Sequence, residues 1–416
     1  MCLPSPPTAG MDSPPDCTHP KSGMHPLLSP CWKQTANDCT LDHVLRSIGA
    51  ALHRKESRVT KGKRLVLTPA GQIEVEEFEV PVPAANQLLV RTSLTQVSAG
   101  SEMNGIRRRR TASPAEQASF TPEGLGYTAI GVVEEAGSEI DQVAVGDRVL
   151  CSGNHSTHWL ITPELEASEV VIPQQYNVQK LPDDLTDVEV AFCVLGDVAL
   201  HGVRRAQIQI GESVAVHGLG VVGLLALQLC RLVGAQPLIG VDLVEERLDL
   251  ARQLGASHLV DAGSQDVVEE IRAHTQLPWR WRGALPSMLP GSGAEVQLHC
   301  TSFIGNYPTM IKAAADRGRI ILVGATSGSI PIESNELFRR EIVMTGSYQT
   351  GMSDTHPYWP WTRVRNQHVI LDLIRRRELQ TEPLVSHVVP YTEAPDLFDR
   401  MMSGHEGWLS VFFTWD

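Results

Sequence analysis

The chain of 416 residues has no long run of uncharged apolar residues and no excess of positive charge. No such run reaches the ~18 residues that span a bilayer, so no membrane span is expected. The formal net charge of −13 repels phosphate backbones and anionic lipid, which argues against nucleic acid and membrane surfaces as partners. The four arginines at 107–110 are expected to form a solvated loop, with an anion contact in a site as the alternative. The expected partner is a small molecule.

The sequence also lacks closely spaced cysteines. Its eight cysteines stand at positions 2, 17, 31, 39, 151, 193, 230 and 300, and none of them forms a C-x-x-C pair. This spacing favours free thiols in a reducing compartment, so a cytoplasmic location is expected. Residues 1–60 are rich in Pro, Ser, Cys and Thr and show no charged segment followed by an apolar core. They are predicted to be a disordered leader with one weak helix at 41–53.

The rest of the chain is long enough for two domains, because a domain usually holds ~100–200 residues. Between residues 61 and 190, Val-rich stretches alternate with Gly turns, which predicts a small, partly open β-barrel. Between 191 and 345, strand and helix patterns alternate, which predicts an α/β domain with a parallel sheet. Residues 346–416 are predicted to return to the first domain. The proline-rich segment 277–292 is predicted to be an inserted surface loop.

A glycine-rich motif lies directly after an apolar strand and opens an apolar helix. It consists of Gly218, Leu219, Gly220, Val221, Val222 and Gly223. In this context G-x-G-x-x-G predicts a dinucleotide site, because the first glycine permits a tight turn and the second lets the backbone approach the pyrophosphate. The third glycine lets helix and strand pack closely, and the phosphates face the helix N-terminus. A purely structural glycine turn is the alternative.

The second strand predicted in this domain ends at Asp242, about 20 residues after Gly223. A carboxylate there accepts hydrogen bonds from ribose hydroxyls and repels a 2′-phosphate, so NAD is favoured over NADP. Arg247 leaves NADP possible, and a strand-end or helix-capping role for Asp242 also stays open. Further cofactor contacts are expected at the carboxyl ends of later strands, from Thr301, Gly324, Ala325, Gly346 and Ser347.

Two stretches resemble the medium-chain dehydrogenase/reductase superfamily, namely GYTAIGVVEEAGSEIDQVAVGDRV at 126–149 and SVAVHGLGVVGLLALQLCRLVGAQPLIGVD at 213–242. The resemblance covers the chain from residue 63 onward. It implies an α/β protein with a GroES-like β-barrel catalytic domain and a Rossmann domain with a doubly wound parallel sheet. It also implies an NAD(P)-dependent oxidoreductase and a homodimer paired through an edge strand such as VMTGSY. A narrower similarity is to zinc-less subfamilies that include bacteriochlorophyllide dehydrogenase-like and sugar or cyclitol dehydrogenase-like proteins.

Zinc-dependent members of this superfamily carry a cysteine ligand at the position of Ala99, and a histidine and a glutamate at those of Tyr127 and Thr128. Alanine has no lone pair, and tyrosine and threonine are poor zinc ligands, so no catalytic zinc is expected. Cys193 and Asp197 lie near the third ligand position and are expected to be a buried thiol and a local hydrogen-bonding or site carboxylate. The four closely spaced cysteines of the family's structural zinc lobe have no counterpart here.

Without zinc, a protein hydrogen-bond donor has to stabilise the reacting oxygen. By resemblance, Tyr127 points into the former metal site as donor or acid, and Ser101 relays the substrate proton. Glu102 supports the network beside them, although a purely structural role is equally open.

His155 and His158, three positions apart, could suggest a metal pair, but they are expected to be ordinary strand-loop histidines. His201 either lines the cleft near the nicotinamide or caps or packs the helix that links the domains. Asn104 stands where some members carry a proton-shuttling histidine.

Three functions fit these residues. The first is interconversion of a secondary alcohol and a ketone by hydride transfer on a polar or polycyclic substrate. The second is an NAD(P)H-dependent enone or quinone reductase, since hydride addition to a conjugated acceptor needs no Lewis acid. The third is a non-catalytic dinucleotide-binding protein. The segment YWPWTRVRNQH at 358–368 is aromatic and basic, and it is expected to close over a substrate or to pack on a neighbouring subunit.

Overall fold

The structure, a computed structural model, describes residues 60–162, 178–275, 292–348, 361–404 and 407–415. The chain divides into two units, residues 1–58 and 59–416, and every described residue lies in the second. Almost all of the predicted leader, its helix at 41–53 and nearly all of the loop predicted at 277–292 lie outside the described residues. Within the described part, no helix has the length and apolar character needed to cross a membrane.

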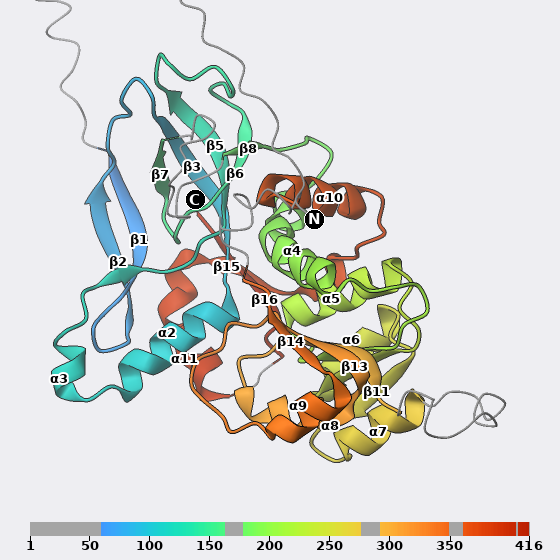
Figure 1. Cartoon of the computed structure of the whole chain (residues 1–416). Coiled ribbons are helices and arrows are strands. Elements are labelled where there is room, and N and C mark those ends of the chain that lie inside the picture. Colours follow the sequence, from blue (N-terminus) through green and yellow to red (C-terminus); the bar gives the residue numbers. More distant parts are fainter. Residues whose placement is uncertain (1–59, 163–177, 276–291, 349–360, 405–406, 416) are drawn as a thin grey trace, which may run out of the picture. The chain divides into compact units, whose positions relative to one another are not determined.

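Two sheets form the first domain (Figure 1). The small sheet has the order β2-β1-β4, and the large one has the order β15-β16-β3-β5-β6-β8, with β7 also paired to β3. The strands of the small sheet are β1 Lys61–Leu67, β2 Ile73–Glu79 and β4 Glu123–Gly124. Those of the large sheet are β3 Leu88–Gln96, β5 Ala129–Ala136, β6 Arg148–Cys151, β7 His158–Ile161, β8 Gln179–Lys180, β15 Val385–Pro390 and β16 Ser410–Thr414.

The long central strand β3 explains why the large sheet curls. Its register with β5 shifts at two places, between Leu89 and Val90 and between Thr92 and Leu94, and such bulges bend a strand and increase its twist. The side chains on the inner face then share one buried core, made of Leu88, Val90, Ala129, Val133, Val149, Cys151 and Ile161. The predicted GroES-like β-barrel is confirmed.

Strands from the last part of the chain complete this sheet. Strand β16 runs antiparallel to β3, with Phe412 opposite Gln96 and Thr414 opposite Leu94, and β15 lies parallel to β16. Helix α11 (Ala394–Ser403) buries Leu397 and Phe398 in a second core of the same domain. Strands β15 and β16 therefore extend the sheet to which β3, β5 and β6 belong.

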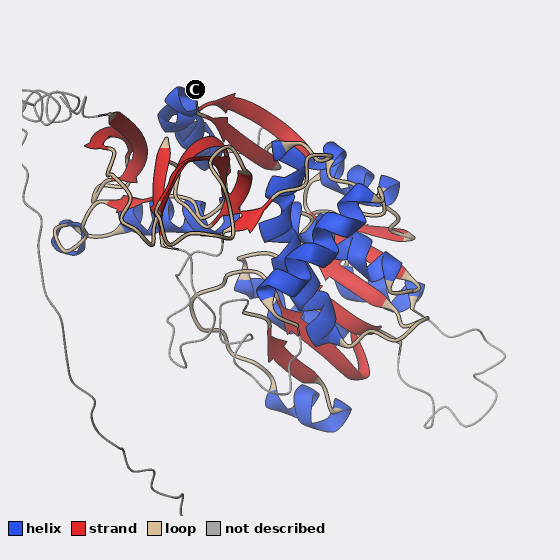
Figure 2. Cartoon of the chain, turned by 90° about the horizontal axis from the view of Figure 1, so that it is seen from above, coloured by secondary structure: helices blue, strands red, loops and turns tan. Residues whose placement is uncertain are grey.

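The second domain is a six-stranded sheet with the order β11-β10-β9-β12-β13-β14. Every neighbouring pair in it is parallel, and helices cover both faces (Figure 2). Its strands are β9 Val214–His217, β10 Leu238–Asp242, β11 His258–Asp261, β12 Ala294–His299, β13 Ala314–Leu322 and β14 Val343–Gly346. Its helices are α5 Val221–Leu232, α6 Glu245–Gln253, α7 Val267–His274, α8 Tyr307–Ala313 and α9 Ser334–Arg340. The predicted α/β class with a Rossmann sheet is confirmed, and the order reverses between β9 and β12, where such sheets bind ligands.

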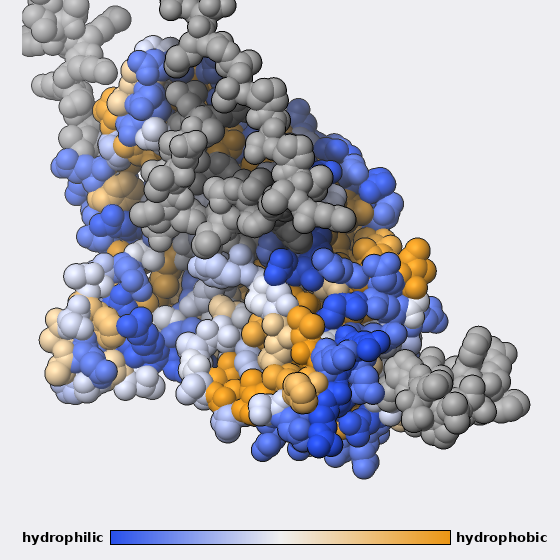
Figure 3. Space-filling model, viewed as in Figure 1, coloured by the Kyte–Doolittle hydropathy of each residue, from blue (hydrophilic) through white to orange (hydrophobic). Residues whose placement is uncertain are grey.

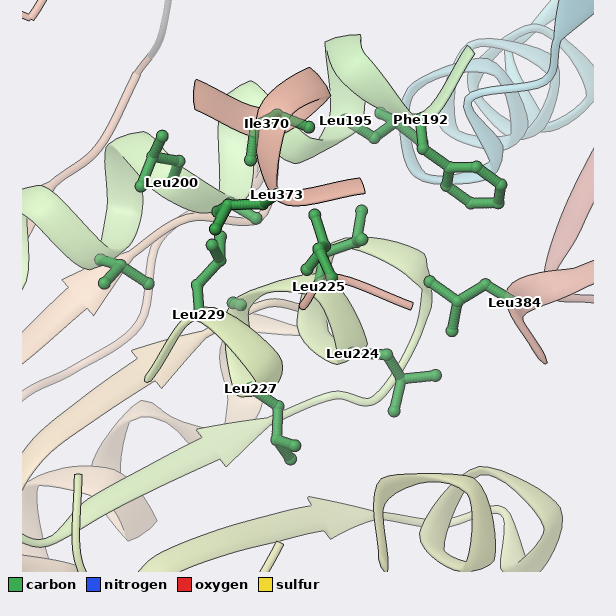
Figure 4. Close-up of a cluster of buried hydrophobic side chains, with 14 of the residues drawn as sticks. Phe192, Leu195, Leu200, Leu224, Leu225, Leu227, Leu229, Ile370, Leu373 and Leu384 are labelled. Carbon is green, nitrogen blue, oxygen red and sulfur yellow. The ribbon is translucent and has the colours of Figure 1, made fainter. Parts of the chain in front are cut away.

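Helix α4 (Asp187–Ala206) joins the two domains. It begins at a capping box in which the Thr186 side chain and the Glu189 side chain each accept a backbone N–H of the other residue. Its apolar face packs against α5 and α10 (Arg363–Arg375), as Figure 4 shows for Phe192, Leu195, Leu200, Leu224, Leu225, Leu229, Ile370 and Leu373. Full burial of each such side chain contributes about 1.5–3 kcal/mol, so this core fixes α4 on the sheet.

The prediction that the arginines at 107–110 form a solvated loop is wrong. They lie in helix α2 (Ala99–Thr111), and Arg109 is buried. Its guanidinium donates to the carbonyl oxygens of Leu67, Thr68 and Thr121 and pairs with Glu123. The planar guanidinium of arginine can donate to several carbonyl oxygens at once, and these hydrogen bonds offset the cost of burying its charge.

Candidate active site

A cleft of about 1840 Å³ lies between the barrel and the carboxyl ends of the parallel strands. Its walls come from α2 and the segments around β4 and β6 on one side, and from the loops after β9, β10, β12, β13 and β14 on the other. Most of the predicted cofactor residues line it: Gly218, Gly220, Val221, Val222, Asp242, Thr301, Gly324, Ala325, Gly346 and Ser347. Leu219 and Gly223 stand behind this surface, and Leu219 is fully buried in the core.

The glycine-rich turn connects β9 to α5, and each glycine meets a different constraint. Gly218 has φ +89°, a left-handed conformation, and its N–H donates to the carbonyl of Val241 at 2.8 Å. A Cβ on Gly223 would lie 1.8 Å from the carbonyl oxygen of Gly218, whereas a Cβ on Gly220 would meet nothing within 4 Å. Gly220 is the N-cap of α5 and supplies no side-chain cap. The first turn of α5 therefore presents backbone N–H groups to the cleft, as an anion site requires.

Asp242 ends β10 and holds the glycine-rich turn. One carboxylate oxygen accepts the N–H of Leu219 at 2.5 Å, and the other accepts those of Leu243 at 2.8 Å and Val244 at 3.0 Å. Both carboxylate oxygens keep further lone pairs, and the residue lines the cleft. The Asp242 carboxylate therefore caps backbone N–H groups and lines the cleft at the same time, so the two interpretations of this residue are compatible.

Several cleft residues were not predicted. Trp408 is one of them: its carbonyl accepts a hydrogen bond from Arg247, the residue that the sequence left open as an NADP contact, so the C-terminal part of the chain reaches the cofactor side. Phe303, 68% exposed, follows β12 at the rim. His217, at the end of β9, bonds Gln297 at 2.8 Å, and burial lowers its pKa to about 4, so its ring is neutral at pH 7. Ligands bind at the carboxyl ends of parallel strands, so the sequence could have predicted His217 and Phe303 at the cleft. The sequence could not have predicted Trp408, because only the fold brings it to the cleft.

On the barrel side, Tyr127 and Ser101 both line the cleft. The Tyr127 hydroxyl lies 2.5 Å from the hydroxyl of Ser98, the residue before α2. Burial raises the pKa of Tyr127 and the nearby Glu102 carboxylate raises it further, while hydrogen bonds from Ser98 and Ser101 act in the opposite direction. A neutral phenol that can donate a hydrogen bond therefore faces the cleft.

Glu102 lies behind the cleft wall. It is 5% exposed, and one of its oxygens accepts the backbone N–H of Ser98 at 2.6 Å. Its other oxygen lies 3.1 Å from Nε2 of His155, whose Nδ1 lies 2.7 Å from the hydroxyl of Thr95. Sequence reasoning treated His155 as an ordinary histidine and missed this buried contact, which joins residues 53 positions apart.

The other predicted candidates lie apart from these residues. His158 pairs with Glu134 at 3.3 Å on the barrel surface, so it shares no partner with His155. His201 is buried on α4 and does not line the cleft, and burial, then Arg205 and Arg204, lowers its pKa to about 4. The side-chain oxygen of Asn104 accepts a hydrogen bond from Arg107 at 3.0 Å.

Comparison with known proteins agrees with this architecture. A family model described as zinc-binding dehydrogenase matches residues 221–363. The L-threonine 3-dehydrogenase of Deinococcus radiodurans is 26% identical over 368 residues, which cover 84% of this chain and 96% of that protein. The structure of galactitol-1-phosphate dehydrogenase from Escherichia coli aligns with a TM-score of 0.66 and 19% identity over 85% of this chain and 99% of that one. The short chain alcohol dehydrogenase of Escherichia coli CFT073 in complex with NADH aligns with a TM-score of 0.64 and 16% identity over 85% and 99%.

A glycine-rich turn at the switch point of a parallel sheet, facing a β-barrel across a cleft, defines a two-domain dinucleotide-binding oxidoreductase. The matching family model and the relatives that align along nearly their whole length agree with this class. The chain is similar in sequence and fold to medium-chain dehydrogenases/reductases, and it is an NAD(P)-dependent oxidoreductase.

The matching family model is described as zinc-binding, so the side chains on the barrel side decide whether a catalytic zinc could be held. The resemblance equates the family's first ligand positions with Ala99, Tyr127 and Thr128, and these residues offer no thiolate, imidazole or carboxylate. Among the described residues, no group of three or more His, Cys, Asp and Glu could hold a metal ion. The buried Cys193 thiol donates to the carbonyl of Gln367, and burial followed by Asp197 raises its pKa well above the usual value, which disfavours a thiolate. These residues do not fit a catalytic zinc.

Proposed function

We propose that this protein interconverts a secondary alcohol and a ketone by hydride transfer with NAD(H), without a catalytic zinc. The observation that carries the proposal is that Tyr127 and the glycine-rich turn face one cleft. When bound, the nicotinamide accepts or donates the hydride. The relatives named above, which include threonine and galactitol-1-phosphate dehydrogenases, support an alcohol substrate.

The protein's own part in the reaction is to hold the substrate oxygen and its proton. The Tyr127 hydroxyl donates a hydrogen bond to a ketone oxygen, or accepts the proton of an alcohol, and its 2.5 Å contact to Ser98 passes that proton on. Removal of one such preorganised donor typically costs about 100- to 1000-fold in kcat. Ser101, at the same wall, supplies a second hydroxyl.

We propose NAD over NADP because Asp242 lines the cleft at the end of β10. Its carboxylate, already held by three backbone N–H groups, is fixed where a ribose would lie, and a 2′-phosphate there would be repelled. Arg247, also on the cleft wall, is the residue that a phosphate would contact in the opposite case.

The test begins with purified protein of known metal content, titrated with NADH and NADPH and then assayed with ketones, enones and quinones. We expect tighter NADH binding, ketone turnover, and a loss of about 100-fold or more in kcat for Tyr127→Phe. Tyr307→Phe is the matched control, because the Tyr307 hydroxyl contacts Thr326 and does not line the barrel wall. Stoichiometric zinc would contradict the metal-free mechanism. A preference for NADPH together with enone turnover would favour the enone or quinone reductase. Tight NADH binding without any turnover would favour a non-catalytic dinucleotide-binding protein.

We also propose a homodimer formed through the edge of the parallel sheet. Among the described residues, β14 is one of the two edge strands of the parallel sheet, and Val343 on it is 51% exposed. Phe338 on the neighbouring helix α9 is 83% exposed, and apolar side chains gather around these elements (Figure 3). An open, apolar sheet edge is a ready site for pairing. Sedimentation should show a dimer for the native chain and for Val82→Lys, an exposed control, and a monomer for Val343→Lys.

A cytoplasmic location is proposed on the state of the thiols. The described cysteines, Cys151, Cys193, Cys230 and Cys300, are all free, which suits a reducing compartment. A fluorescent fusion of the full chain should fill the cytoplasm, and an exclusively organellar or secreted signal would contradict this assignment.

A further inference from the structure

A buried chain of polar groups runs behind the wall that carries Tyr127. The indole Nε1 of Trp415 donates to the Thr95 hydroxyl at 2.9 Å, and Thr95 contacts Nδ1 of His155 at 2.7 Å. Nε2 of His155 contacts Glu102 at 3.1 Å, and Glu102 accepts the N–H of Ser98 at 2.6 Å. His155 is fully buried and Glu102 nearly so. Groups this deep are costly unless each is hydrogen-bonded, so the connections constrain one another.

Donor and acceptor roles along this chain follow from chemistry. A carboxylate can only accept, so Nε2 of His155 carries the ring hydrogen, and in the neutral ring Nδ1 accepts from the Thr95 hydroxyl, whose oxygen accepts the indole N–H. Nε2 thus donates to Glu102. Glu102 thus accepts from two directions, from His155 and from the Ser98 backbone, as a carboxylate does.

Ser98 is held in an unusual way for a residue before a helix. It is the N-cap of α2, yet its side chain makes no capping bond, and its backbone N–H is held by Glu102. The hydroxyl is therefore left to contact Tyr127 at 2.5 Å on the cleft wall. A helix start normally uses such a hydroxyl for its own N–H groups.

We propose that Glu102 and His155 form a buried positioning couple that aims the Ser98 hydroxyl at Tyr127, and that Ser98 is the proton partner of Tyr127 in the reaction. This inference rests on the proposed function. In alcohol oxidation the C–H bond breaks and its electron pair leaves as hydride to the nicotinamide. The alcohol O–H proton passes to the Tyr127 oxygen, the Tyr127 proton passes to Ser98, and the Ser98 proton passes to water in the cleft. Glu102 and His155 exchange no proton in this step.

The test compares the buried couple with a matched pair on the surface of the same barrel. Ser98→Ala, His155→Gln and Glu102→Gln should each lower kcat by about 10- to 100-fold, the usual effect of removing partners that orient a reacting group. The KM for NADH should change little in each. His158→Gln and Glu134→Gln, from the partly exposed pair at 3.3 Å, should behave as the native enzyme. Equal activity of the two sets of variants would overturn the proposal.

A second readout needs no turnover. The ultraviolet difference spectrum on titration to high pH, taken against Tyr127→Phe, follows ionisation of that phenol. Ser98→Ala should raise the pH of ionisation, since it removes a hydrogen bond to the phenolate, and Glu102→Gln should lower it, since it removes a nearby negative charge. An unchanged titration in both variants would refute the coupling even if the native protein turned over no substrate. A native protein without turnover but with these shifts would refute only the proposed function.

Thr95 keeps the test informative if the larger changes prevent folding. Thr95→Val keeps the shape of the side chain but removes the hydroxyl between His155 and Trp415, and it should reduce kcat. Thr95→Ser keeps the hydroxyl and should restore most of the activity. Full activity in Thr95→Val with an unchanged thermal midpoint would contradict the positioning role.

Discussion

The glycines of the β9–α5 turn allow fold and binding to be perturbed separately. In Gly223→Ala the new Cβ would lie 1.8 Å from the Gly218 carbonyl oxygen, and Cβ contacts below 3.0 Å essentially do not occur. Helix α5 must therefore move from the turn by about 1.2 Å or more. Overpacking of this kind costs about 1–3 kcal/mol. At about 2–4 °C per kcal/mol, Tm should fall by roughly 2–12 °C.

Gly220→Ala is the matched change. Its Cβ meets nothing within 4 Å and its φ of −68° suits alanine, so the free energy of unfolding should change by less than about 1 kcal/mol. The methyl group stands where the pyrophosphate would approach, so the Kd for NADH should rise at least about tenfold, or 1.4 kcal/mol. Calorimetry and NADH fluorescence titration measure the two effects. Native affinity in Gly220→Ala, or a native Tm in Gly223→Ala, would refute this account of the turn.

Three further predictions concern single side chains. Asp242→Ala should bring the Kd values for NADH and NADPH toward each other in a binding titration, and a preserved NADH preference would contradict its role at the ribose. Arg109→Ala should lower the free energy of unfolding in urea by about 2–4 kcal/mol because three carbonyls lose their donor, while Arg108→Ala, exposed on the same helix, should change it by less than about 0.5 kcal/mol. The pKa of His217 is about 4 in the folded protein and 6.5 in the unfolded chain, so the unfolded chain binds the proton more readily. The free energy of unfolding should therefore be constant above pH 6.5 and should fall as the pH drops from 6.5 toward 4. This fall should be less steep in His217→Gln.

The fold was predictable because its signals are local. Alternating strand and helix patterns determine a parallel sheet, and the Gly218–Gly223 motif reports backbone conformations that a short segment fixes for itself. The place of Asp242 on the cleft was predictable for the same reason, since it ends a strand at a fixed distance from that motif. Position along a strand or turn is information that the sequence carries directly.

The barrel side of the site was less predictable because its contacts join distant segments. Glu102 and His155 meet only once β1, β3 and the loop before β7 have been placed, and no periodicity records that meeting. The arginines at 107–110 show the same limit. Charge predicts that such a run is solvated, but only the packing of α2 against the barrel decides that Arg109 is the one turned inward.

The contact between Trp415 and Thr95 joins residues 320 positions apart. Strand β3 lacks its β16 partner until synthesis has passed residue 414, whereas the strands of the parallel sheet pair with segments nearer in sequence and can form earlier. Assembly of the proton-handling wall should therefore be the last event in the protein's maturation, slow because of its high contact order. Any chain interrupted before β16 should be able to bind a dinucleotide while lacking a finished reaction centre.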